Sequence, residues 1–456
     1  IVANAFVMAV VFLLFHVTKQ QLGKALGYFG LIVYWLGFEY FHLRWELTWP
    51  WLTLGNGLAE APMLIQWYEW VGTLGGSLWL LGVNLLVYRA LQLWWDLRQQ
   101  SKAHPEDEDL PLYRRVRHRL SLLKLAGLVG VPIAISLILW YTYDDSDQST
   151  AEVVVVQPNI DPYTQKFRGA PDFIPYAQQV DRMLRLSDSL LTDSTAVVAW
   201  PETSMPGGLD VRDIWRFPQV QQVVEWVQQY PSLAMMIGIE GYVRYGDYRA
   251  TATARYYEDA DEYYDAFNTA IYLTADTGQF TYYHKSKLVP GVERMPYPEV
   301  FRFLEGFAIN MGGISGSLGT QHDREVFYTT DSLGLAPIIC YESVFGDFVT
   351  DYVAKGADLL FIITNDGWWG NTAGYKQHLA YARLRAIETR RSIARSANTG
   401  ISGFINQRGE IRQTTDWWVP TAARSSLRIN TATTAYVQYG DAVGRTAGLI
   451  AILLLL

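Results

Sequence analysis

Four uncharged apolar stretches in the first third of the chain limit most strongly what it can fold into. A stretch of about 17 apolar residues is roughly 26 Å long as a helix, which is close to the thickness of the hydrocarbon core of a bilayer. The sequence therefore predicts a region that crosses a membrane several times. Three stretches have this length, residues 1–17, 72–88 and 125–141, and a shorter fourth one, residues 26–38, ends at Glu39 and is the weakest of the expected spans.

Basic residues between these stretches predict the topology. Residues 89–119 form a loop with the densest cluster of arginine and lysine in the chain, and Lys19 and Lys24 lie in the first short loop. Basic loops stay in the cytoplasm, so both loops are expected inside and everything after Asp144 outside. The tryptophan-rich segment 45–55, interrupted by Pro50, is typical of a lipid–water boundary.

From residue 151 the pattern changes to short apolar runs that alternate with helical stretches, which predicts an α/β domain. The expected domains are a transmembrane helical region over 1–143, an extracytoplasmic domain over 151–430 and the start of a C-terminal transmembrane helix over 445–456. Because the chain begins at Ile1 and ends within an apolar run, we expect it to be truncated at both ends. Expected strands cover 153–156, 196–199, 234–239, 270–273, 336–339, 358–364 and 400–405; expected helices cover 178–191 and 375–394; and 241–264 is expected to be a surface insertion that acts as a mobile lid.

Cys340 is the single cysteine among 456 residues and ends a short apolar run. A lone cysteine is often a small buried hydrophobic residue, and its other interpretation is a nucleophile. Two further runs end in charged residues, at Glu202 and at Lys285. A carboxylate, an ammonium group and a thiol at three strand ends supply a base, an oxyanion stabiliser and a nucleophile, which acyl transfer through a thioester requires.

The order Glu202, Lys285, Cys340 resembles the nitrilase (carbon-nitrogen hydrolase) superfamily. Within it, the strings Trp200-Pro-Glu-Thr-Ser, Lys285-Ser-Lys-Leu-Val-Pro, Cys340-Tyr-Glu and Thr364-Asn-Asp-Gly-Trp-Trp-Gly resemble the apolipoprotein N-acyltransferase family. The resemblance runs over nearly the whole chain. It implies a nitrilase-like αββα sandwich fused to transmembrane helices, whereas periodicity alone predicts only an α/β domain.

The resemblance also implies the catalytic roles. Cys340 is the nucleophile and Glu202 is the base. We expect partial shielding from water to raise the basicity of Glu202. The family pattern Lys-x-x-Leu-Val-Pro assigns the cationic role to Lys285 and leaves Lys287 as a surface charge.

Further residues are expected around this triad. Glu293 and Glu342 orient Lys285, hold the incoming amine or form structural salt bridges, and Tyr341 either faces the oxyanion or packs. Trp368 either contacts acyl chains or is buried, and His378 is interpreted as a structural histidine. The sequence departs from the common family pattern at Gly291-Val292 and at Phe167, which affects the presumed substrate loops and therefore donor choice more than the chemistry.

The resemblance implies that the acyl donor is a phospholipid and that the acceptor is the diacylglyceryl-cysteine of a bacterial lipoprotein. It implies no cofactor or metal. It also implies a monomer in the bacterial inner membrane, with its catalytic domain facing the periplasm. A net charge of −8 provides no basic surface for nucleic acid, and one cysteine excludes an intramolecular disulfide. The alternatives are a membrane-tethered amidase that acts on a small amide, and a non-catalytic membrane scaffold.

The topology predicts a labelling pattern. In a Cys340→Ala background, a cysteine introduced at Ser101 should not react with a small membrane-impermeant maleimide in intact cells, because the basic loop lies inside, whereas one introduced at Ser189 should react. Permeabilised cells, in which both should be labelled, are the control. The reverse pattern would invert the topology.

Overall fold

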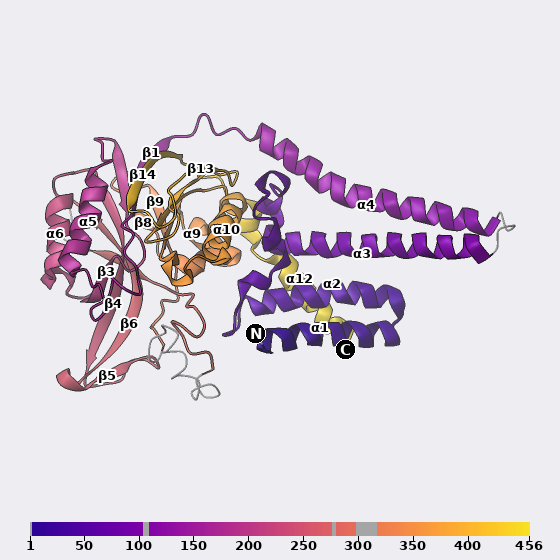
Figure 1. Ribbon diagram of the computed structural model, residues 1–456, viewed down its shortest axis with the longest axis horizontal. Coiled ribbons are helices and arrows are strands. Elements are labelled where there is room, and N and C mark those ends of the chain that lie inside the picture. Colours follow the sequence, from indigo (N-terminus) through magenta and orange to yellow (C-terminus); the bar gives the residue numbers. More distant parts are fainter. Residues whose placement is uncertain (1, 104–108, 276–279, 298–316) are drawn as a thin grey trace. The chain divides into compact units, whose positions relative to one another are not determined.

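The computed structural model describes residues 2–103, 109–275, 280–297 and 317–456. It contains two compact units, Ile1–Tyr143 together with Tyr439–Leu456, and Asp144–Gln438. Each unit is considered by itself below. Figure 1 labels their helices and strands.

The first unit is helical. Three of its described helical segments are long and apolar enough to cross a membrane: Val2–Gln21, Tyr68–Gln99 and Arg115–Thr142. The helices are α1 (Val2–Gln21), α2 (Gly23–His42), α3 (Tyr68–Ala103), α4 (Asp109–Thr142) and α12 (Ala442–Leu455), with three short 3-10 helices, η1 (Pro50–Leu52), η2 (Leu54–Leu58) and η3 (Pro62–Leu64), between α2 and α3.

Helix α2 contains the expected span 26–38 but is not among these three segments that are long and apolar enough to cross a membrane. It carries Glu39, which is 1% exposed and whose carboxylate accepts hydrogen bonds from the Trp35 indole and the Leu54 amide at 2.9 Å each. Helices α1 and α12 pack on α2. Helix α4 instead leaves apolar side chains such as Leu123 and Ile138 more than half exposed, the kind of surface that lipid covers.

The expected basic loop over 89–119 is wrong as a description of the backbone. Helix α3 continues through Arg98 to Ala103, and α4 already includes Arg115 to Arg119. The reason is that this segment is rich in good helix formers such as leucine, glutamine, arginine and lysine, so the helices extend beyond their apolar parts. The connection at 104–108 lies outside the described residues.

The second unit contains two sheets. The first has the order β14-β1-β2-β4-β6-β5, with β3 paired to β4 and β7 to β6, and the second has the order β13-β12-β11-β10-β9-β8. Strands β1, β2 and β4 are parallel neighbours, as are β9, β10 and β11. The first sheet comprises β1 (Thr150–Gln157), β2 (Thr195–Ala199), β3 (Met205–Asp210), β4 (Ala234–Gly246), β5 (Arg255–Tyr257), β6 (Glu262–Thr274), β7 (Thr281–His284) and β14 (Thr421–Arg428). The second comprises β8 (Phe327–Tyr328), β9 (Gly334–Ile339), β10 (Leu359–Thr364), β11 (Ser392–Ala397), β12 (Gly403–Ile405) and β13 (Ile411–Thr414).

Helices cover the outer face of each sheet (Figure 1). Helices α5 (Tyr176–Asp188) and α6 (Pro218–Val227) pack on the first sheet through an apolar core that includes Met183, Val223 and Met235. Helices α9 (Gly346–Ala354) and α10 (Ala373–Thr389) pack on the second. Between the sheets, the Ser396 hydroxyl on β11 lies 2.8 Å from the Val156 carbonyl oxygen and 3.0 Å from that of Ala199. The expected αββα sandwich is confirmed.

Two local expectations are wrong. Half of residues 241–264 lie in strands, because β4 extends to Gly246, β5 follows and β6 begins at Glu262, so this region continues the first sheet and is not only an insertion between strands. The helix expected over 375–394 ends at Thr389, where Arg390 adopts a left-handed conformation and β11 begins two residues later. The strands within 241–264 were missed because tyrosines and charged residues occur together there, which is typical of an exposed loop. The end of the helix was missed because Arg391 is a charged residue that is nevertheless buried.

Gly238 in β4 allows the segment after β2 to lie directly across this strand. A Cβ atom at Gly238 would lie 2.5 Å from the Pro201 carbonyl oxygen, 2.6 Å from Glu202 Cα and 2.8 Å from the Thr203 nitrogen. These are backbone atoms that cannot rotate away. The position of Glu202 therefore depends on the absence of a side chain at residue 238.

We predict that Gly238→Ala destabilises the protein by about 1–3 kcal/mol, because overpacking against backbone forces strands apart, and that it displaces Glu202. The measurement is the thermal unfolding midpoint in detergent. Gly448→Ala is the control, because a Cβ there has no neighbour within 4 Å. Equal midpoints for both variants would contradict the predicted clash.

Candidate active site

Three of the sequence-predicted residues lie together at strand ends of the two sheets. Glu202 follows β2, Lys285 follows β7 and Cys340 follows β9. Their exposed fractions are 4%, 1% and 8%. Lys285 Nζ lies 3.0 Å from Glu202 Oε1, and the Glu202 carboxylate and the Cys340 thiol influence each other's pKa. Residues distant in the sequence therefore form one buried group of carboxylate, ammonium and thiol.

The Glu202 carboxylate is held from several sides. The Asn268 side-chain amide donates to Oε1 at 2.7 Å, and the Asn365 backbone amide donates to Oε2 at 2.9 Å. Asn268 lies on β6, and Asn365 follows β10. These bonds fix both oxygens, so the carboxylate has a defined direction toward the thiol.

The charges at the site correct one expectation from the sequence. Burial raises the pKa of Glu202, but the Lys285 ammonium and the hydrogen bonds from Lys285, Asn268 and the thiol more than offset it, so the net pKa is below the usual value. The expected rise in the basicity of Glu202 is therefore wrong for the resting site. A desolvated carboxylate beside a fixed cation is stabilised in its charged form.

Lys285 stays protonated. Burial lowers its pKa, but Glu202 and Glu293 together raise it well above the usual value. Lys285 Nζ lies 2.8 Å from Glu293 Oε1, whose other oxygen accepts the Val289 amide at 2.8 Å. Glu293 thus holds the Lys285 ammonium group through an ion pair between two residues of the same loop.

Cys340 is a thiol in the resting site. Burial, and then the Glu202 carboxylate, raise the pKa of Cys340 far above that of a free cysteine, and Lys285 offsets only part of this. Its backbone has φ of +49°, in the left-handed region, which costs a non-glycine residue on the order of 1–2 kcal/mol. The strained residue begins the 3-10 helix η7 (Cys340–Val344), which directly follows β9.

Glu342 connects two parts of the site. Its Oε1 accepts hydrogen bonds from the Tyr283 hydroxyl at 2.7 Å and the Ser286 amide at 2.6 Å, and its Oε2 accepts the Ile339 amide at 2.9 Å. The residues on either side of Lys285 are thereby tied to the turn that carries Cys340. Tyr341 is 2% exposed and packs edge-to-face on Phe345 at 5.1 Å.

Lys166 was missed by the sequence interpretation. It is 1% exposed, and its Nζ lies 2.8 Å from the Thr203 hydroxyl and 3.3 Å from the Glu202 carbonyl oxygen. Thr203 has φ of +49°, so Lys166 holds a strained backbone directly after Glu202. The only signal in the sequence was a lysine immediately before Phe167, which does not distinguish a buried lysine from an exposed one.

An aromatic group lies next to these residues. The rings of Phe167 and Trp368 stack with centroids 6.1 Å apart, and the Tyr163 hydroxyl donates to the Trp368 carbonyl oxygen at 3.0 Å. Trp368 is 39% exposed and Tyr163 is 52% exposed. Val292, one of the two departures from the family pattern, is 43% exposed.

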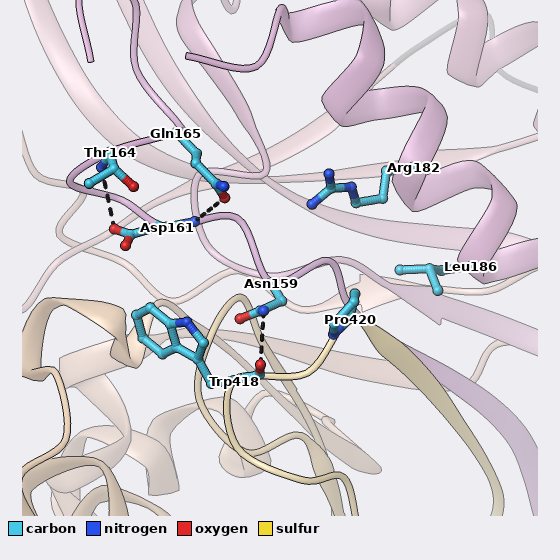
Figure 2. A pocket seen from close by; sticks show the side chains of 8 residues that line it. All are labelled: Asn159, Asp161, Thr164, Gln165, Arg182, Leu186, Trp418 and Pro420. Atoms are coloured by element: carbon cyan, nitrogen blue, oxygen red, sulfur yellow. Dashed lines mark hydrogen bonds between the residues drawn. The ribbon is translucent and has the colours of Figure 1, made fainter. Parts of the chain in front are cut away.

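A cavity of about 590 Å³ lies between the segment after β1, helix α5 and the segment before β14. Figure 2 shows Arg182 and Leu186 on one side of it and Trp418 and Pro420 on another. No member of the triad lines it. Its connection to the site is indirect: the Asn159 amide donates to the Asn398 carbonyl oxygen, and the Asn398 side chain donates to that of Asn365.

The fold and the buried group of glutamate, lysine and cysteine define the class of this protein. The family model for carbon-nitrogen hydrolases matches residues 153–435, and the chain belongs to that family. Residues 1–86 match the model of the apolipoprotein N-acyltransferase N-terminal domain.

Similar proteins carry the name of one enzyme. The chain is 29% identical to the apolipoprotein N-acyltransferase of Chlorobaculum tepidum over 94% of this chain and 76% of that protein. It is 26% identical to the enzyme of the same name from Thermotoga maritima, over 89% of this chain and 65% of that protein. A solved structure, an amidase of the nitrilase superfamily from Nesterenkonia AN1, covers 66% of this chain and 97% of its own with 14% identity and a TM-score of 0.42.

The buried Lys166 predicts a pH dependence of stability. Burial lowers the pKa of Lys166 to about 8, below the value of about 10.4 in an unfolded chain. Between these pH values the unfolded chain binds more protons than the folded chain, so the contribution of this group to stability rises with pH. The full effect is about 3 kcal/mol.

The measurement is the thermal unfolding midpoint of wild type and Lys166→Met at pH 7.5 and at pH 10. We expect the wild-type midpoint to rise relative to that of the variant at the higher pH. Because other groups titrate equally in both proteins, the difference isolates Lys166. A constant difference would place its pKa at the ordinary value.

Proposed function

We propose that this chain is an N-acyltransferase that moves an acyl chain from a membrane phospholipid, through a thioester on Cys340, to the α-amino group of the N-terminal diacylglyceryl-cysteine of bacterial lipoproteins. The observation that carries the proposal is the buried ion pair of Glu202 with Lys285 at 3.0 Å, together with the buried Cys340 thiol whose pKa both groups influence. The names of the relatives support the choice of substrates.

In the first half-reaction, Glu202 accepts the thiol proton while Cys340 Sγ attacks an ester carbonyl carbon of the phospholipid. Because the resting cysteine is a thiol and the carboxylate is ionised, the proton moves during the attack rather than before it. The tetrahedral oxyanion then collapses, the carbon–oxygen bond breaks, and the proton on Glu202 passes to the leaving lysophospholipid. The acyl group remains on sulfur.

Lys285 stabilises the oxyanion in this step. An ammonium group has three N–H donors, and among the described residues Glu202 and Glu293 accept two of them. The third donor is the one that we assign to the oxyanion. A fixed charge in a site shielded from water is typically worth a few kcal/mol in the transition state.

In the second half-reaction, the α-amino group of the lipoprotein attacks the thioester carbonyl carbon. Glu202 takes a proton from the attacking nitrogen and transfers it to the departing Cys340 sulfur, so the products are an amide and the original thiol. Glu293 and Glu342 hold Lys285 and its loop in place through both steps. Burial of the site keeps water from the thioester, which would otherwise be hydrolysed.

The aromatic group of Tyr163, Phe167 and Trp368, with Val292, is the surface that we assign to the acyl chains. These side chains are partly exposed, and Trp368 contacts the rings of both Tyr163 and Phe167. Both substrates are held in a bilayer, which is the physical reason for combining a hydrolase fold with apolar helices. We propose that the chain acts as a monomer in the inner membrane, with the catalytic domain in the periplasm.

We predict that purified protein incubated with phospholipid, in the absence of lipoprotein, gains the mass of one acyl chain on Cys340. Glu202→Gln and Lys285→Met should form this adduct at least about 100-fold more slowly, because they remove the base and the oxyanion donor. The measurement is intact-mass spectrometry against time.

Lys287→Met is the matched control, because it removes the neighbouring lysine without touching Glu202, and it should react at the wild-type rate. An adduct that forms with a small amide but not with phospholipid would favour a membrane-tethered amidase. A chain that forms neither adduct would point to a non-catalytic scaffold and overturn the proposal.

A further inference from the structure

A second buried polar group lies behind the nucleophile and includes none of the triad. It consists of Asp366, His378 and Arg395, each 1% exposed or less. Arg395 Nη2 lies 2.7 Å from Asp366 Oδ2, and His378 Nδ1 lies 3.0 Å from Asp366 Oδ1. The residues come from η8 (Asp366–Trp369), α10 and β11, so the group joins three elements of the second sheet layer.

The other nitrogen of His378 faces the backbone of Cys340. His378 Nε2 lies 3.1 Å from the Cys340 carbonyl oxygen and 2.8 Å from the Ser343 hydroxyl. The Ser343 hydroxyl itself donates to the Cys340 carbonyl oxygen at 2.7 Å. A carbonyl oxygen only accepts, so a hydrogen bond from His378 to the Cys340 carbonyl uses a proton on Nε2.

The same group also reaches the sulfur side of Cys340. The Thr364 hydroxyl donates to Asp366 Oδ1 at 2.9 Å, and Thr364 and Asp366 both influence the pKa of the Cys340 thiol. The polar group around Asp366 therefore acts on the sulfur of Cys340 and, through His378, contacts its carbonyl oxygen.

From the contacts of His378 with Asp366 and with the Cys340 carbonyl oxygen we propose that His378 is a positioning residue, which holds the Cys340 carbonyl and thereby keeps the nucleophile in its left-handed conformation with the sulfur beside Glu202. The proposal rests on the proposed role of Cys340 as nucleophile. It assigns a function to a histidine that the sequence suggested to be only structural.

The strain at Cys340 explains why such a residue is needed. A left-handed cysteine relaxes toward ordinary β or helical geometry unless the surrounding structure prevents it. Relaxation would rotate the Cα–Cβ bond and move the sulfur away from Glu202. A misplacement of about 1 Å can reduce a rate by about 100-fold.

Asp366 and Arg395 determine the orientation of the His378 imidazole. Burial raises the pKa of Asp366, but Arg395 and His378 more than offset it, so the carboxylate stays ionised. Arg395 Nη2 also lies 3.1 Å from His378 Nδ1, and Trp369 packs edge-to-face on the imidazole at 5.3 Å. The imidazole therefore cannot turn without breaking several contacts at once.

The test compares two substitutions of one residue. The side-chain amide of His378→Gln reaches about as far as Nε2 and retains a donor to the Cys340 carbonyl. The amide of His378→Asn reaches only about as far as Nδ1, so it retains the contact with Asp366 and loses that donor. Each protein is reacted under single-turnover conditions with phosphatidylethanolamine vesicles, and separately with iodoacetamide, with intact-mass detection of the Cys340 adduct.

We expect His378→Asn to slow both reactions at Cys340 by about 30-fold at unchanged apparent KM for phospholipid, and His378→Gln to remain within about fivefold of wild type. The thermal unfolding midpoints of both variants should stay close to that of wild type. The rescue by glutamine is the result that a purely structural histidine does not produce.

Two results would overturn the proposal: wild-type rates in His378→Asn, or equal slowing of both variants together with a lowered unfolding midpoint. The iodoacetamide reaction separates this inference from the proposed function. If wild-type protein does not take an acyl chain from phospholipid but the iodoacetamide rates follow the expected order, the proposed function fails and the role of His378 stands.

Discussion

The ion pair of Lys285 with Glu202 and Glu293 is the interaction on which the site depends. A buried ammonium is stable only where carboxylates compensate for its lost hydration, and here two lie within 3.0 Å. The same pair determines the protonation of the site, because it keeps Glu202 ionised, while burial keeps Cys340 as a thiol. An ionised carboxylate, an ammonium group and a neutral thiol are therefore buried together in one site.

Strained backbone at two strand ends is the second structural requirement. Thr203 and Cys340 both have left-handed φ values, and each lies against buried polar side chains from another element. Lys166 contacts the Thr203 hydroxyl beside Glu202, and His378 contacts the Cys340 carbonyl oxygen. Gly238 adds a third condition, because its missing side chain lets the segment with Glu202 cross β4. Reactive geometry is thus maintained by residues that touch no substrate.

Much of the fold was predictable, for identifiable reasons. Apolar runs identified most of the buried strands, and the resemblance supplied the sandwich and the members of the triad. The sheet character of residues 241–264 was missed because alternating tyrosine and charge looks like an exposed loop. The lowered pKa of Glu202 was missed because it depends on the distance to Lys285, which is 83 positions away in the chain. Neither Lys166 nor His378 has a local pattern that distinguishes a buried role from an exposed one.

The sequence by itself determined the division into apolar helices and an α/β domain, because hydrophobic periodicity is a local property of the chain. It also determined which residue types are available for chemistry, since only one thiol exists. Only the tertiary structure decided which charges meet, what their contact does to each pKa, and which buried side chains hold Cys340 in place. Those properties depend on distances between segments that are far apart in the chain, and these distances become short only when the two sheets pack together.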